Sequence, residues 1–133
     1  MTYPSHPYSP PAFGLETERF EPGGVLVTVV GELDVATVPA LRGPLDAALD
    51  SGVRRVVIDL HELAFLDSIA VAALLQVRRR LGPGGRLAVV VAPDSYTRMV
   101  FEIAGLPRSL DIVATRAEAI AAVGGGERGA AAA

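Results

Sequence analysis

Hydrophobic and polar residues follow two different periods along the chain, and the first period is that of a strand. Residues 12–20 alternate between apolar and polar side chains, and 25–31, VLVTVVG, form a β-branched run; EPGG separates the two segments. Alternation and β-branched runs bounded by glycine and proline are typical of strands. The pattern therefore predicts a β-hairpin, with 12–20 at the edge of a sheet.

After residue 31, helical and strand patterns alternate as far as residue 123. Apolar residues at helical spacing predict helices over 38–49, 68–81, 94–105 and 115–123. Apolar, β-branched runs predict strands over 53–60, 86–92 and 110–114. Strands that alternate with helices favour right-handed β-α-β crossovers and a parallel sheet. The predicted fold is thus α/β, a mixed and mostly parallel sheet begun by an antiparallel hairpin, with about four helices.

The two ends of the chain lack this patterning. Residues 1–11, MTYPSHPYSPP, carry four prolines and no hydrophobic period, which predicts a disordered Pro-rich tail. Residues 124–133, GGGERGAAAA, are expected to form a flexible Gly/Ala tail. A single domain is therefore expected over 12–123.

Composition narrows the chemistry that the domain can perform. The 133 residues suffice for one domain with a sizeable core. Cysteine is absent and all twelve basic side chains are arginine, which excludes disulfides, thiolate catalysis, Schiff-base lysines and a Walker lysine. His6 and His61 are the only histidines. We therefore expect neither a metal site nor a cofactor.

Charge and hydropathy indicate where the protein acts. The net charge is −3, so the chain lacks the basic character of nucleic-acid binding domains. No segment approaches the ~20 consecutive apolar residues of a membrane span, and the N-terminus lacks a signal-peptide pattern. The sequence predicts a cytoplasmic protein that binds neither membrane nor nucleic acid.

Polar residues follow three of the predicted strands, at the sheet edge where α/β proteins gather their ligands. Glu32 and Asp34 of GELD lack a partner histidine, lysine or metal cluster, so they indicate a capping turn and not a general acid-base pair. His61-Glu62 lacks the second histidine of a helical metal site and is expected in an exposed loop. The third polar segment is APDSYT, 92–97. The polar residues of the three segments together do not form a catalytic constellation, so the sequence does not predict an enzyme.

The pair Asp67-Ser68 begins the predicted helix over 68–81 and has two open interpretations. Asp and Ser are common helix caps, worth about 1 kcal/mol. A helix N-terminus also accommodates a phosphate, so a phosphoserine here would add negative charge without unfolding the domain.

The two faces of the same helix differ in character. Helical spacing predicts a core face at Val71, Leu74, Leu75, Arg78 and Leu81. The other face consists of small or apolar residues and one amide, which are Ile69, Ala72, Ala73 and Gln76. Such a face suits close approach by a partner protein; burial beneath another helix of the same domain is the alternative.

Three stretches carry a family resemblance. In order, they are VVGELDVATVPALRGPLDAAL, VRRVVIDLHELAFLDS and GGRLAVVVAPDSYTRMVFEIAGL. Together they resemble the STAS domain of bacterial anti-sigma factor antagonists, over about 12–123. The resemblance implies a small α/β domain that is not an enzyme. It also implies a partner, an anti-sigma factor of the serine-kinase type, whose binding releases a sigma factor for transcription.

The loop departs from the family pattern at the residue that matters most. The family reads Asp-Ser-Ser/Thr-Gly and is phosphorylated on the second hydroxyl, which prevents binding. Asp67 and Ser68 match the first two positions, but Ile69 and Ala70 occupy the others. Ser68 is the remaining candidate for phosphorylation, and it is rotated by about 100° around the helix from the usual position. The phosphoserine switch is therefore predicted to be lost or altered.

The resemblance and the helix pattern together predict a partner-binding surface. Its residues are Asp34, Asp67, Ser68, Ile69, Ala72, Ala73 and Gln76. The alternative function is a non-switching STAS scaffold or sensor that binds another protein, or a small ligand near GELD and APDSYT. No Gly-rich phosphate loop supports a nucleotide in that place.

Overall fold

A hairpin opens the fold, as the sequence predicts. The computed structural model describes residues 11–108 and 110–132. β1 (Gly14–Phe20) pairs antiparallel with β2 (Gly24–Leu33). The predicted disordered tail lies outside the described residues, apart from Pro11.

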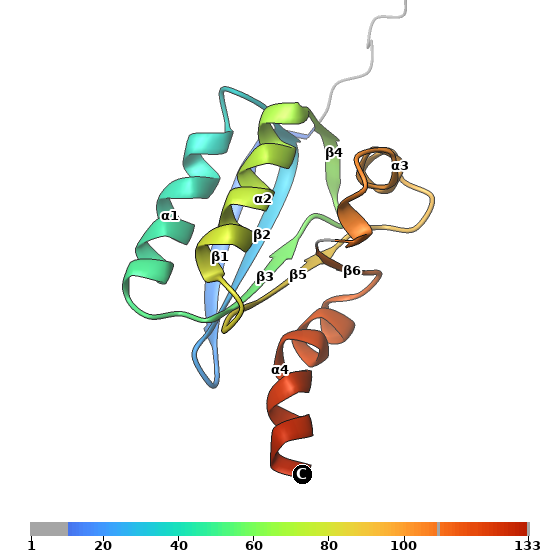
Figure 1. The fold of residues 1–133 in the computed structure, drawn as a ribbon. Helices are drawn as coiled ribbons and strands as arrows, with labels where there is room; N and C mark the ends of the chain where they lie inside the picture. Colours follow the sequence, from blue (N-terminus) through green and yellow to red (C-terminus); the bar gives the residue numbers. More distant parts are fainter. Residues whose placement is uncertain (1–10, 109, 133) are drawn as a thin grey trace, which may run out of the picture.

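Four helices and four further strands follow in the described part of the chain (Figure 1). They are α1 (Val38–Asp50), β3 (Arg55–Asp59), β4 (Leu63–Leu66), α2 (Ser68–Leu81), β5 (Arg86–Val90), α3 (Tyr96–Ile103), β6 (Asp111–Val113) and α4 (Arg116–Ala132). A 3-10 turn separates α3 from β6. The helix predicted to end near Val123 continues as α4 to Ala132, so its backbone enters the predicted Gly/Ala tail.

The strands form one mixed sheet in the order β1-β2-β3-β5-β6. All pairs beyond the hairpin are parallel. This confirms the predicted α/β class. β4, which the sequence pattern does not predict, pairs with β2 over Gly31–Leu33, beyond the part of β2 that pairs with β3.

Gly31 allows the chain to pass close to β2 at this point. Its φ is +91°, a value that favours glycine. A Cβ at this position would lie 2.8 Å from Cα of Phe13 and 3.0 Å from the carbonyl oxygen of Pro11. The glycine of GELD therefore has a steric role beside the carboxyl end of β2.

Helices cover both faces of the sheet. α1 and α2 lie side by side on one face and α4 lies on the other (Figure 1). Because side chains of a strand alternate between faces, β2 directs Val27 into the larger core with Leu45 and Leu74 of α1 and α2. The neighbouring Leu26 enters a smaller core with Ala119 of α4.

Two arginines tie the helices to their surroundings. Arg80 at the end of α2 pairs with Asp46, at 3.0 Å, and with Asp50, both on α1. The hydrogen bond to Asp50 raises the pKa of Arg80 above its usual value. Arg116 at the start of α4 donates to the buried Asp59 of β3, at 2.9 and 3.1 Å.

No described helix is long and apolar enough to cross a membrane.

Candidate functional site

Three loops meet at one edge of the sheet, where β2, β4 and β5 end. The first follows β2 and contains Asp34, the second contains Asp67 and Ser68, and the third contains Ser95. The backbone N–H of Asp67 donates to the carbonyl oxygen of Leu33, at 3.2 Å, which joins the first two loops directly. The first two strand ends singled out in the sequence are therefore neighbours, and α3, which follows the third, lies against β4.

Asp34 organises a turn and does not cap α1. Its Oδ1 accepts from the N–H groups of Ala36, at 2.9 Å, and Thr37, at 3.1 Å. Thr37 occupies the N-cap position of α1, and its hydroxyl donates to the carbonyl oxygen of Glu32, at 2.8 Å. One oxygen of Asp34 thus accepts from two backbone amides of a turn, and the prediction that this turn caps the helix through Asp34 is wrong, because Thr37 holds the N-cap position.

Asp67 is the N-cap of α2, which confirms the capping interpretation for this residue. Its Oδ1 accepts from the N–H of Ala70, at 3.0 Å. Ser68 is the first residue of the helix and is exposed. The free amides of the first turn and the exposed hydroxyl lie together at the helix N-terminus, where negative charge is favoured.

Substitution of Asp67 by alanine is expected to lower the free energy of unfolding by about 1 kcal/mol, the usual contribution of a cap. The N–H of Ala70 would lose its acceptor. Urea denaturation followed by circular dichroism measures the change, and D67N is the matched control because it keeps a capping oxygen. Equal losses in both variants would mean that the carboxylate charge, and not the cap, stabilises α2.

The exposed face of α2 agrees with the sequence at three of its four positions. Ile69 is 47% exposed, and Ala72 and Gln76 are also exposed. Ala73 is only 3% exposed and belongs to the core, so the prediction that it lies on the partner-binding face is wrong.

The core face of α2 is rotated relative to the predicted one. Leu74 and Leu81 are buried as expected, but their buried companions are Ala70, Ala73 and Val77. The alanines face the core because a small side chain lets the helix approach the sheet closely. Of the residues assigned to that face, Val71 and Leu75 are partly buried, and so is Arg78, which donates to the carbonyl oxygens of Gly82 and Gly85.

Four exposed apolar residues lie near these loops, and the sequence pattern does not single them out. They are Val35, Phe65, Tyr96 and Met99. Phe65 of β4 and Tyr96 of α3 stack, with ring centroids 5.7 Å apart and an interplanar angle of 16°. All four residues of LAFL are apolar, so no alternation with polar residues marks Phe65 as the exposed one between the buried Leu63 and Leu66.

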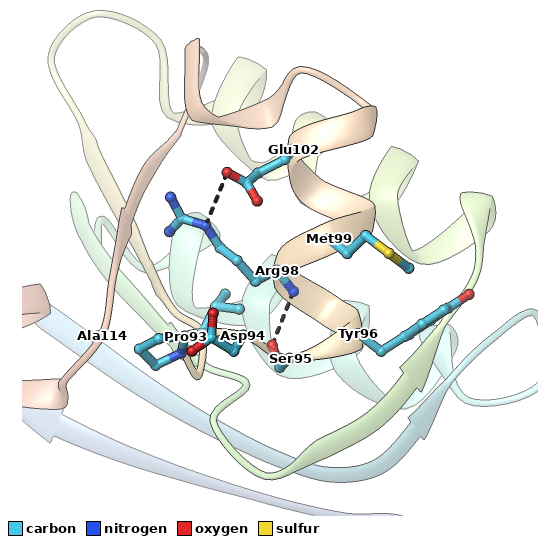
Figure 2. Close-up of a pocket in the computed structure, with 9 residues that line it drawn as sticks. Pro93, Asp94, Ser95, Tyr96, Arg98, Met99, Glu102 and Ala114 are labelled. Atoms are coloured by element: carbon cyan, nitrogen blue, oxygen red, sulfur yellow. Dashed lines mark hydrogen bonds and ion pairs between the residues drawn. The ribbon is translucent and has the colours of Figure 1, made fainter.

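A cavity of about 690 Å³ lies beside the third loop (Figure 2). Ser95 caps α3 by accepting from the N–H of Arg98, at 3.0 Å, and Arg98 pairs with Glu102 at 3.8 Å. Asp94 and Met99 also line the cavity. Because it opens next to APDSYT, the cavity lies where the alternative small-ligand site was expected.

The residues considered for metal binding do not converge. His61 and Glu62 are both exposed, as expected of a loop. Within 11–108 and 110–132, no group of three or more metal-ligating side chains comes together.

Comparison with known proteins gives a consistent result. The family model described as STAS domain matches residues 16–119. The anti-sigma-F factor antagonist RsfB of Mycobacterium tuberculosis is 28% identical over 104 residues, which cover 78% of this chain and 84% of RsfB. An anti-sigma factor antagonist from Mycobacterium paratuberculosis has a similar crystal structure, with a TM-score of 0.78, 29% identity, and coverage of 86% of this chain and 97% of that one.

The antagonist SpoIIAA in its unphosphorylated form has a TM-score of 0.72 and 29% identity, with coverage of 84% of this chain and 97% of SpoIIAA. The matched range 16–119 contains most of the hairpin, the three loops and the start of α4. The resemblance in sequence is therefore confirmed by the fold. The relatives described above are named anti-sigma factor antagonists, and this chain belongs to the STAS domain family.

Proposed function

We propose that this protein is an anti-sigma factor antagonist that binds an anti-sigma factor of the serine-kinase type and so releases a sigma factor. The observation that carries the proposal is the exposure of Ile69 in the first turn of α2, at the loop by which the family is recognised. A large apolar side chain that is exposed at the start of a helix adds little to the stability of the fold, but it can be buried in a contact with another protein. The proposed partner also implies a cytoplasmic location.

Ile69 further suggests that binding is not controlled by phosphate in the usual way. An isoleucine has no oxygen to phosphorylate, and Ser68, the adjacent hydroxyl, points about 100° away around the helix. We therefore propose an antagonist that keeps its affinity when the kinase has ATP. Ile69 would serve as an apolar contact where a hydroxyl would serve as a switch.

A non-enzymatic role is supported by the use of the loop carboxylates. Asp34 and Asp67 each hold backbone amides, at 2.9 to 3.1 Å. The chain has no lysine, and neither loop contains a histidine that could share a proton with these carboxylates. Their role in the proposed function is to fix the backbone of the two loops that carry the exposed residues.

Incubation with candidate serine-kinase anti-sigma factors, with and without ATP, tests the proposal. We expect a complex that persists in ATP, measured by size-exclusion chromatography, and an unchanged intact mass of this protein. The matched variant I69S restores a hydroxyl at the usual position and is expected to gain a phosphate and lose the complex in ATP.

Two results would contradict this proposal in different ways. A phosphate on Ser68 that abolishes binding, and is absent from S68A, would mean that the switch has moved by one residue. Failure of every candidate to bind, in either condition, would remove the antagonist function itself.

A ligand-sensing role is the second candidate, and the cavity beside α3 favours it. Its volume of about 690 Å³ lies within the range of small-molecule pockets, and Asp94, Arg98 and Glu102 supply charged groups to its lining. Titration with nucleotides and measurement of the melting temperature separates the two functions. A saturable rise in melting temperature with a nucleotide would support a sensor, because a ligand that binds only the folded state stabilises it.

A further inference from the structure

Helix α3 exposes an apolar face that its own fold does not use. Tyr96, Met99 and Ile103 are 47%, 49% and 80% exposed. Their spacing of three and four residues places them on one side of the helix. The helix is held to the core by Phe101, which is fully buried on another side. The three exposed side chains are therefore available for a contact outside the domain.

This face is continuous with the loop at the start of α2. Tyr96 stacks on Phe65 of β4, and β4 leads directly into the Asp67 cap and Ile69. Tyr96 and Met99 project from one side of α3, and Arg98 and Glu102 project from the other (Figure 2). All four side chains line the cavity, so the apolar face forms part of its rim. Phe65, Ile69, Tyr96, Met99 and Ile103 together form what we call the apolar strip.

The segments that carry the apolar strip, with the adjoining loop after β2, are predominantly acidic. Residues 32–37, 61–69 and 94–103 contain six carboxylates and a single arginine, Arg98, which is paired with Glu102. Glu32 is the register partner of Phe65 on the adjacent strand, and Asp94 immediately precedes α3. A partner that covers the strip must therefore accept an apolar centre and an acidic border.

We propose that the α3 face is the second half of the partner-binding surface, and that it docks on a protein face with an apolar centre and an arginine- or lysine-rich border. This inference rests on the proposed function, since the partner is the anti-sigma factor. Tyrosine and methionine are enriched in the cores of protein interfaces, and complementary charge speeds association. The acidic border disfavours the phosphates of nucleic acids and of anionic membranes.

The test compares M99E with I120E in the full-length protein. Both variants place a carboxylate on a partly exposed apolar position, but Ile120 lies on α4, away from the strip, and is 39% exposed. We expect M99E to weaken the complex with the anti-sigma factor at least about tenfold by isothermal titration calorimetry, a loss of ~1.4 kcal/mol. The control I120E is expected to bind as the unaltered protein does.

Salt provides an independent readout for the acidic border. We expect the association rate of the unaltered protein to fall as the salt concentration rises, because screening weakens the attraction between the two charged borders. The variant D94N is expected to associate more slowly at low salt and to show a smaller salt dependence. An association rate that rises with salt would contradict a basic border on the partner.

The possible outcomes separate this inference from the proposed function. If I69D loses binding while M99E does not, the antagonist function stands and the α3 face is overturned as part of its surface. If no anti-sigma factor binds the unaltered protein, both are overturned. If the protein alone self-associates at the binding concentrations and M99E abolishes this, the strip is covered by a second copy, and the inference is wrong.

Discussion

Substitution of Ile69 by aspartate is expected to weaken binding of the anti-sigma factor by about a hundredfold, or ~2.8 kcal/mol. The variant replaces an apolar side chain that is 47% exposed with a charge. In the complex that charge would be desolvated against an apolar surface, which is costly without a cation to pair with. Isothermal titration calorimetry with the purified anti-sigma factor measures the loss.

The same variant is expected to fold as well as the unaltered protein. Residue 69 lies in the first turn of α2, which has no acidic residue of its own. A carboxylate at this position is favoured by the helix dipole. An unchanged or slightly raised melting temperature would therefore accompany the loss of binding. Unchanged affinity in a folded I69D would overturn the assignment of this surface.

Substitution of Phe101 by alanine is expected to lower the free energy of unfolding by about 3–5 kcal/mol. Phe101 is the largest fully buried side chain of the described chain and anchors α3 to the main core. The short helix α3, Tyr96–Ile103, has few other buried side chains to hold it. Removal of the Phe101 ring would leave a cavity beneath the helix that carries Tyr96 and Met99. Urea denaturation gives the change in the free energy of unfolding.

The matched control for F101A is I103A on the same helix. Ile103 is 80% exposed, so its truncation removes few packing contacts and is expected to change stability by less than about 0.5 kcal/mol. A loss in F101A no greater than that in I103A would mean that α3 is not anchored through this ring.

Most of the fold was predictable because its strands and helices differ clearly in period. The run VLVTVVG in β2 and the helical spacing of Leu41 and Leu45 in α1 left little ambiguity. β4 was missed because four residues, LAFL, are too short to show a period beside a long helix. Its identity depends on pairing with β2, which no local pattern reveals.

The site was predictable where backbone chemistry fixes a residue, and less so where packing does. Asp67 caps its helix, and Asp34 holds a turn, because short carboxylates bind free amides. Ala73 was misplaced since alanine fits a core or a surface equally well, and tertiary packing decides. The stacking of Tyr96 on Phe65 joins segments far apart in sequence, so only the folded chain brings them together.

The shared dependence of two loops on β2 has a consequence for how the protein can diverge. Both the turn at Asp34 and the start of α2 are hydrogen-bonded to the end of this strand, through the carbonyl oxygens of Glu32 and Leu33. The frame is therefore made by main-chain atoms and capping oxygens, and the exposed side chains are not part of it. A different side chain at position 69 can then change what this surface contacts without changing the backbone that presents it. Relatives that keep these main-chain bonds can therefore differ at one or two exposed side chains and still hold the same loops in place.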